Sequence, residues 1–254
     1  MKTLFFFFST LYECLSQINM SRKSTNKILL CGSSHAQSSF VPEMASNIYS
    51  VTFASQDLDA ALKILKFYHQ IHKIERFAIF LSVFSPGFHL IKSKEHGRMY
   101  ALRFALIISL FPSQIFMLSL TLCYIIVKII PNKLLTKNKI TNVEHRISRH
   151  INYGKMRDSM VYLSDIINYC QSQQIRLFFV LSPASRLYRE QCKKHIMPFG
   201  YLDELTSFSD EIKIIDLFNT DQFDNGDWED SDHLHVGGST AAQVTREILE
   251  RISI

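Results

Sequence analysis

Glycine, proline and cysteine are scarce in this sequence. Its 254 residues include 8 Gly and 6 Pro, too few for a collagenous or low-complexity chain. The 5 Cys are odd in number and widely spaced, without a CxxC pair, which favours reduced thiols over a disulfide framework or a zinc site. No P-loop and no G-x-G-x-x-G is present, so nothing indicates nucleotide binding. These absences favour an ordinary globular chain that needs no cofactor.

Apolar residues are abundant, and charge is unevenly distributed. At 47% hydrophobic residues the chain can bury a sizeable core, and its length corresponds to one or two domains. The net charge of +5 conceals a basic segment from Lys92 to Arg157 and an acidic one from Asp203 to Asp232. The basic segment lacks a helix-turn-helix, a zinc-finger spacing or an aromatic RNA-binding pattern, so we expect no nucleic-acid partner.

The N-terminal residues 1–20 are set apart by their composition. A Lys and a run of Phe give them a weak likeness to a signal peptide, but Glu13 follows closely and no small-residue cleavage site is present. Met20 offers an alternative start. We therefore interpret 1–20 as a leader or a mis-assigned start, 21–254 as a single domain, and the protein as cytoplasmic, with peripheral membrane association as a further option.

Short runs rich in β-branched and aromatic residues alternate with helical periods. Strands are expected at 27–31, 48–53, 77–83, 175–181 and 212–216. Amphipathic helical stripes lie between these strands and after the last of them. Because the runs are almost continuously apolar, they are typical of strands buried on both faces. The pattern predicts an α/β fold, an open parallel sheet with helices on both faces and ligands at the carboxyl ends of its strands.

One long apolar segment interrupts this alternation. Residues 104–127 contain no charge and are long enough for a transmembrane helix, but Pro112 divides them into two short pieces. Basic residues flank the segment on both sides. We predict a basic, hydrophobic helical insertion over 96–155. Its segment 104–127 is expected to contact a membrane surface, or to form a helical hairpin that packs on its own domain or on a dimer partner, with a single span as a further alternative.

Two polar motifs could carry chemistry. Gly32, Ser33 and Ser34 directly follow the first strand, and a Ser in such a turn exposes its hydroxyl at the carboxyl edge of the sheet. Near the C-terminus, His233 follows Asp230 by three residues, a spacing that allows the carboxylate to orient the imidazole as a general base.

The acidic motif has other interpretations. Asp230, Asp232, His233 and His235 could instead bind a divalent metal, which would make the protein a metal-dependent hydrolase. The same residues could also form nothing more than a solvated loop. Residues and spacing leave these possibilities open.

Together the two motifs resemble those of the SGNH, or GDSL-like, superfamily of hydrolases and acyltransferases, in particular its polysaccharide-associated esterases and O-acyltransferases. The Gly32-Ser33-Ser34 turn corresponds to the family's G-D-S block, and Asp230 to His233 followed by Gly238 corresponds to its last block. The resemblance implies a flavodoxin-like sheet, Ser34 as nucleophile, and His233 with Asp230 as its base. It covers about residues 27–95 and 155–254.

The resemblance is incomplete in the middle of the chain. It implies backbone N–H groups of Ser34 and Ser55 as oxyanion donors. The family's G-x-N-D block is absent here, and Ser82 or Ser85 could replace its side-chain donor. We further assign substrate binding to His35, Gln56 and Arg186, and no metal to the site.

The resemblance implies a serine esterase or O-acyltransferase that acts on a carbohydrate ester in surface-polysaccharide modification, through an acyl-enzyme on Ser34. The alternative is a non-catalytic carbohydrate-binding or scaffold protein with the same fold. A catalytic pair also constrains the apolar segment, because one span between Ser34 and His233 would place them on opposite sides of a membrane.

Overall fold

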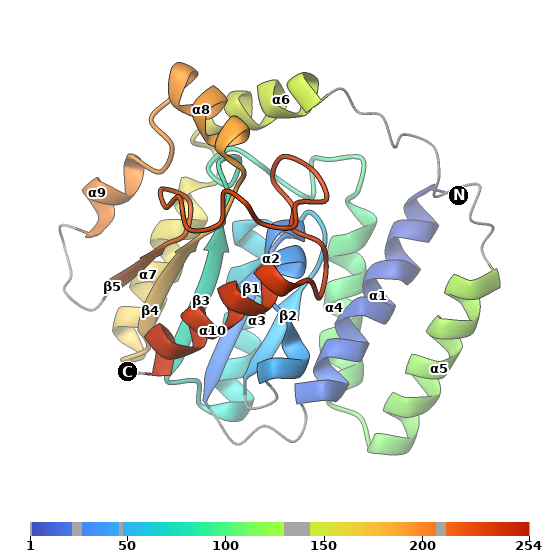
Figure 1. Cartoon of the computed structure of the whole chain (residues 1–254). Helices are drawn as coiled ribbons and strands as arrows, with labels where there is room; N and C mark the ends of the chain where they lie inside the picture. Colours follow the sequence, from blue (N-terminus) through green and yellow to red (C-terminus); the bar gives the residue numbers. More distant parts are fainter. Residues whose placement is uncertain (1, 22–26, 46–47, 130–142, 207–211, 254) are drawn as a thin grey trace.

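A five-stranded parallel sheet forms the centre of the computed structural model (Figure 1). The structure describes residues 2–21, 27–45, 48–129, 143–206 and 212–253. The strand order is β2-β1-β3-β4-β5, and helices cover both faces of the sheet. The predicted α/β fold class, an open parallel sheet with helices on both faces, is therefore confirmed.

The strands lie close to their predicted positions. They are β1 (Ile28–Gly32), β2 (Tyr49–Thr52), β3 (Arg76–Leu81), β4 (Arg176–Leu181) and β5 (Ile212–Asp216). The inner strands are buried on both faces, as their continuous apolar character predicted. β5 is an edge strand, and two of its five residues are exposed.

Alternate residues of the strands point into two separate cores. Leu29, Phe77 and Phe179 belong to the larger core, with the buried faces of α1 (Lys2–Ser21), α3 (Leu58–His72) and α7 (Met160–Ser172). Leu30, Phe80 and Val180 belong to the other core, beneath α2 (Ser34–Ser39) and α10 (Ser239–Ser253). The period-2 alternation of strand side chains thus separates the two helical layers. The 3₁₀ turn η1 (Pro42–Ala45) lies beside α10, and α8 (Arg186–His195) and α9 (Tyr201–Thr206) lie between β4 and β5 in sequence.

The predicted insertion contains α4 (Gly97–Ser109), α5 (Ser113–Ile129) and α6 (Val143–Lys155). The apolar segment 104–127 is divided at Leu110–Pro112 into a helical hairpin, because Pro112 cannot continue the first helix. None of the described helices has the length and apolar character that crossing a bilayer requires. In Figure 1, α4 and α5 lie at one side of the sheet, whereas α6 lies above its carboxyl end beside α8.

The N-terminal residues, which the sequence set apart as a leader or a mis-assigned start, form a helix that packs on the domain. Leu11, Cys14, Leu15 and Ile18 of α1 are buried in the same core as the sheet, and α1 contacts α4, α5 and β2. In the structure, α1 is therefore part of the larger core, although the sequence suggests a domain that begins at residue 21.

Candidate active site

Ser34 is positioned by a tight turn between β1 and α2. It is the first residue of α2, so its backbone N–H has no partner within the helix. The turn requires glycine, because a Cβ on Gly32 would lie 2.5 Å from Cβ of Ala36 and 2.7 Å from Cβ of Phe80. Close packing of α2 on the sheet thus places the Ser34 hydroxyl at the carboxyl end of β1.

His233 meets Ser34 from a loop near the other end of the chain. Nε2 of His233 lies 3.0 Å from Oγ of Ser34, and its Nδ1 lies 3.1 Å from Oδ1 of Asp230. The loop is closed by a bridge between Trp228 and Leu234, and the same Asp230 oxygen accepts the backbone N–H of His233. In the neutral imidazole, Nδ1–H donates to Asp230 and Nε2 accepts the Ser34 hydroxyl, the arrangement of a serine with its general base.

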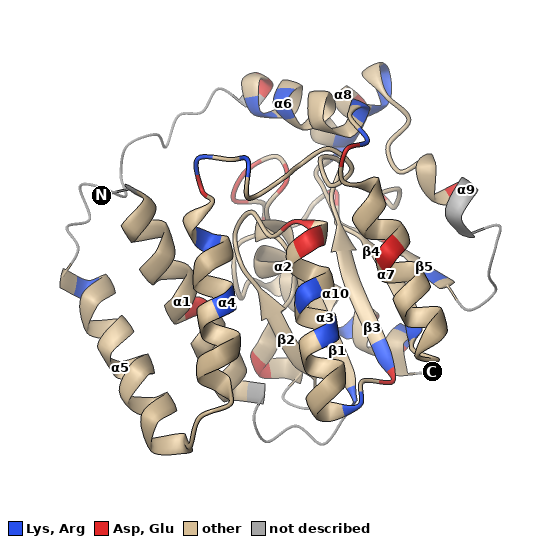
Figure 2. Ribbon diagram, turned by 180° about the vertical axis from the view of Figure 1, so that it is seen from behind, with Lys and Arg blue, Asp and Glu red and all other residues tan. Residues whose placement is uncertain are grey.

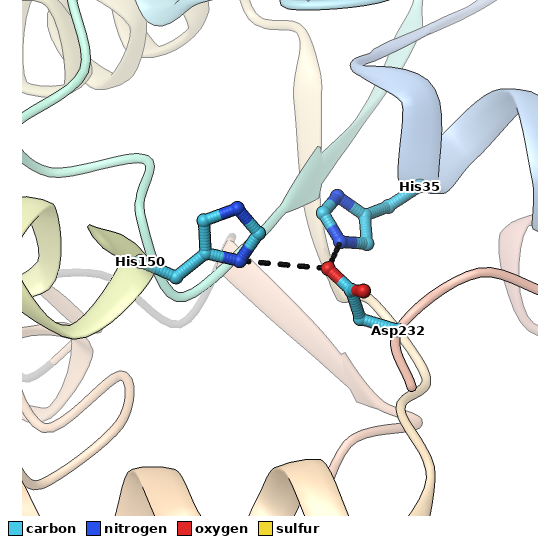
Figure 3. A group of neighbouring side chains, drawn as sticks. All are labelled: His35, His150 and Asp232. Carbon is cyan, nitrogen blue, oxygen red and sulfur yellow. Dashed lines mark hydrogen bonds and ion pairs between the residues drawn. The ribbon is translucent and has the colours of Figure 1, made fainter. Parts of the chain in front are cut away.

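Asp232 is the most buried acid of the site and lies between several histidines. Its carboxylate is fully buried and accepts a hydrogen bond of 2.8 Å from Nε2 of His35. Nδ1 of His150 lies 3.4 Å from the same oxygen, so both imidazoles face one oxygen of the Asp232 carboxylate (Figure 3). The second oxygen of Asp232 lies 3.5 Å from Nδ1 of His233. Asp232 therefore links His233 to two further rings, and His35 also stacks on His233 with 4.5 Å between ring centroids.

Arg146 of α6 joins the two acids. Its guanidinium donates to Asp230 at 2.8 Å and also bonds to Asp232. It thus neutralises part of the negative charge that the two carboxylates place beside His233. Arg146 lies in the insertion, outside the region that resembles the SGNH family, so the motifs of that family give no signal for it.

These contacts shift the ionisation of the site. Burial raises the pKa of Asp230, but hydrogen bonds from His233 and Arg146 outweigh it and lower this pKa to about 2. Burial also raises the pKa of Asp232, yet hydrogen bonds from His233 and His35 hold it well below its ordinary value. For His233, burial lowers the pKa, but the bonds to Asp230 and Asp232 raise it to about 9. His233 is therefore protonated at neutral pH in the unliganded site.

The buried histidines behave in the opposite way. Burial is the main cause that lowers the pKa of His35, and it lowers that of His150 to about 3. Both rings are thus neutral near pH 7. His35 donates to Asp232, whereas Nδ1 of His150 forms its hydrogen bond with the hydroxyl of Tyr188 at 2.8 Å. Nδ1 of His35 then accepts a hydroxyl, from Ser82 at 3.0 Å or from Ser33 at 3.3 Å. The result is a continuous hydrogen-bonded chain beneath His233.

A cavity of about 150 Å³ opens onto Ser34 and His233. Its lining includes Phe84 and Phe88 from the loop after β3, and Arg146, Arg149, His150 and Tyr153 from α6. These four α6 residues follow the i, i+3, i+4, i+7 spacing of one helix face, a signal in the sequence that could have identified them. α6 contacts this loop so closely that a Cβ on Gly87 would lie 2.3 Å from the carbonyl oxygen of Tyr153. The insertion therefore forms one wall of the site.

The predicted oxyanion donors have different surroundings. Ser55 lines the cavity with Ser34 and has a φ of 62°, an uncommon left-handed conformation for a residue with a side chain. Its hydroxyl donates to Glu95 at 2.9 Å, which leaves the backbone N–H as its candidate donor. Ser82 does not line the cavity. Its buried hydroxyl lies against His35, so the prediction that Ser82 supplies a side-chain oxyanion donor does not agree with the structure.

The three predicted substrate-binding residues have other contacts. His35 lines the cavity, but both ring nitrogens are occupied by protein groups, so it positions Asp232 instead. Gln56 is buried outside the cavity and donates to the carbonyl of Val51. Arg186 is exposed on α8 and pairs with Glu190. The structure therefore does not agree with a substrate-binding role for these three side chains. Side chains from α6 line the cavity beside Ser34 instead.

The two acids among the residues predicted as alternative metal ligands are bonded to a positively charged side chain of the protein. Asp230, Asp232 and His233 lie close enough to share an ion, as do His35, His150 and Asp232. His235, the fourth predicted ligand, is exposed and outside both groups. The guanidinium of Arg146 already bonds to both acids, so a positive charge of the protein lies where a cation would bind.

Comparisons with known proteins give distant structural similarity only. The sequence matches no protein-family profile, and no curated protein is detectably similar to it. A Streptococcus pneumonia structure, proposed to be of a platelet activating factor, aligns over 95% of this chain and 91% of its own, with 12% identity and a TM-score of 0.46. A Bacteroides fragilis NCTC 9343 protein proposed to be an acylhydrolase aligns over 89% and 86%, with 8% identity and a TM-score of 0.38. Function must therefore be argued from the side chains of this chain.

Proposed function

We propose that this protein cleaves carboxylic esters through an acyl-enzyme on Ser34. The observation that carries the proposal is the 3.0 Å contact between Oγ of Ser34 and Nε2 of His233, whose Nδ1 lies 3.1 Å from Asp230. Ser34 and the Asp230–His233 pair come from opposite ends of the sequence and together have the order of nucleophile, base and orienting acid. The cavity above Ser34 leaves room for a substrate at this point.

In this mechanism, Oγ of Ser34 attacks the ester carbonyl carbon while its proton passes to Nε2 of His233. The oxyanion would be stabilised by the backbone N–H groups of Ser34 and Ser55, each worth about 3 kcal/mol. As the C–O bond to the alcohol breaks, His233 returns the proton to the departing oxygen. A second nucleophile then attacks the acyl carbon and loses its proton to His233. The bond between the acyl carbon and Oγ of Ser34 breaks, and His233 returns this proton to Oγ, which regenerates the free serine. Water as the second nucleophile gives hydrolysis, and a sugar hydroxyl gives acyl transfer.

The substrate in this proposal is a carbohydrate ester, and the role in surface-polysaccharide modification rests on the resemblance to SGNH enzymes. The aromatic side chains of Phe84, Phe88 and Tyr153 beside Ser34 support it, since they offer apolar faces to a sugar ring or a short acyl chain.

Covalent labelling tests the proposed function directly. The protein should react with a fluorophosphonate probe, and peptide mass mapping should locate the adduct on Ser34. The same preparation should cleave an acetylated sugar or a short aryl acetate. Prior labelling with the probe should abolish this cleavage. Absence of an adduct in folded protein, or an adduct on another residue, would contradict the assignment.

Arg149 supports a more specific substrate, an ester that carries an anionic group. It lines the cavity with Ser34, and no acidic residue contributes to that lining. Arg149 is exposed to solvent, and within the described part of the chain its side chain forms neither an ion pair nor a hydrogen bond. A carboxylate or phosphate on the alcohol portion of the substrate would supply the missing partner.

Substitution of Arg149 by Gln should then raise KM selectively for anionic esters. A hydrogen bond to a charged group contributes about 1.5–3 kcal/mol, equivalent to an increase of about tenfold or more. The measurement compares the Arg149→Gln variant on an acetylated uronic acid and on its neutral sugar analogue. Arg186→Gln is the matched control, because Arg186 lies on the surface outside the cavity. An equal rise in KM for both esters would indicate a structural role instead.

A further inference from the structure

The outer face of α5 exposes an unusual amount of apolar surface. Six of its large side chains are 46–73% exposed: Ile115, Leu118, Leu122, Tyr124, Ile125 and Ile129. Hydrophobic residues exposed singly are common on protein surfaces, but a contiguous patch of this kind marks a contact with another apolar phase.

The neighbouring part of α4 and the turn continue this surface. Phe104 and Ile107 of α4 are 49% and 54% exposed, and Leu110 and Phe111 of the turn are 63% and 45% exposed. The hairpin therefore presents apolar side chains on both helices and at its tip. We use the term hairpin face for the exposed apolar residues from Phe104 to Ile129.

The contacts of α5 within the protein use only one side of the helix. Phe116 and Cys123 are its buried residues, and the helix packs on α1 and α4. A helix that is apolar on all sides is normally buried in a protein core or in lipid. The packing on α1 and α4 therefore leaves most of the apolar circumference of α5 uncovered.

Charge around the hairpin face has a single sign. No Asp or Glu occurs between Glu95 and Glu144, whereas exposed Arg103 and Lys128 lie on α4 and at the end of α5. Figure 2 shows α5 without charged residues except for the basic residue near its C-terminal end. In the sequence, three further lysines follow α5 within residues 130–142. An apolar surface with basic borders complements the acyl chains and anionic headgroups of a lipid bilayer.

We propose that the hairpin face binds the surface of an anionic lipid bilayer, with its apolar side chains in the interfacial region and Arg103 and Lys128 among the headgroups. A second copy of the chain would fit this charge pattern less well. A symmetric contact places the same surface of both copies together and would bring their basic borders close to each other. Anionic lipid neutralises these borders instead.

Vesicle flotation tests this proposal independently of any enzymatic activity. Wild-type protein should float with phosphatidylcholine vesicles that contain phosphatidylglycerol, and more weakly with phosphatidylcholine alone or at high salt. Replacing both Leu118 and Leu122 by Glu should weaken this binding by about tenfold or more, because it removes apolar contacts and adds negative charge. Both side chains are exposed in the structure, so the substitutions leave the core intact.

The matched control replaces Val161 and Met197 by Glu, since these residues are also exposed and apolar but lie outside the hairpin face. It should float like the wild type. Two outcomes would overturn the proposal. One is that the wild type and the Leu118/Leu122 variant float equally well or not at all. The other is a wild-type dimer that does not bind vesicles and that the same two substitutions dissociate, which would identify a second copy as the occupant.

Discussion

Replacement of Ser34 by Ala is expected to lower kcat for ester cleavage by about 1,000-fold or more and to abolish fluorophosphonate labelling. The substitution removes the only hydroxyl that contacts Nε2 of His233 among the described residues. Ser34 contributes little to packing, so the fold should persist. The measurement compares kcat on an acetylated sugar, labelling, and the circular dichroism spectrum for the wild type and the variant.

Ser33 provides the matched control for this experiment. It belongs to the same turn, but its hydroxyl lies 3.3 Å from Nδ1 of His35 and makes no contact with His233. Ser33→Ala should therefore retain labelling at Ser34. Normal ester cleavage by folded Ser34→Ala protein would rule out the acyl-enzyme mechanism.

Replacement of Asp232 by Asn should change both the stability of the protein and its pH dependence. The carboxylate is fully buried and bonds to Arg146 and His35, so loss of its charge should lower the free energy of unfolding by about 3 kcal/mol. It also removes one of the two carboxylates that raise the pKa of His233. The pKa of His233 should consequently fall in the variant.

The sign of the activity change follows from the role of the base. Only neutral His233 can accept the Ser34 proton, and its pKa is about 9, so wild-type kcat/KM should rise as the pH increases toward 9. In Asp232→Asn the same rise should occur at lower pH. A pH profile of kcat/KM for both proteins measures the shift. An identical profile would show that Asp232 does not influence His233.

Stability measurements on the same variant add an independent comparison. The pKa of Asp232 is lowered in the folded protein, so its stabilising effect is complete above the ordinary carboxyl pKa of 3.8 and declines as the pH falls below it. Denaturant unfolding should therefore separate the wild type and Asp232→Asn at pH 7 and bring them closer together in acid. Asp221→Asn is the control, because the Asp221 side chain is 88% exposed and should have little effect at either pH.

The two ends of the site could be predicted because their signals are local. A glycine-containing turn after an apolar strand identifies Ser34, and the three-residue spacing of Asp230 and His233 is visible without any tertiary information. The apolar strands likewise indicate where a parallel sheet forms. Its carboxyl edge is where both motifs meet, as the contact between Ser34 and His233 shows.

The wall of the cavity could not be predicted in the same way. Arg146, Arg149 and His150 lie more than a hundred residues from Ser34, on a helix that the sequence indicated only as part of a basic insertion. Their spacing defines a helix face, but it does not say against which element that face packs. The position of Arg186 after a strand predicts substrate binding, as does that of Gln56, yet their side chains lie outside the cavity.

The strands, the two chemical motifs and the break in the apolar segment at Pro112 can be predicted from the sequence, because short-range periodicity and composition encode local structure. The packing of α1 into the core, the bonds of His35 and Arg146 to Asp232, and the closure of one side of the site by α6 are visible only in the folded protein. These features depend on contacts between residues far apart in the chain. Such contacts form where apolar faces and buried charges meet their partners, and the local pattern of one segment does not show which distant segment supplies the partner.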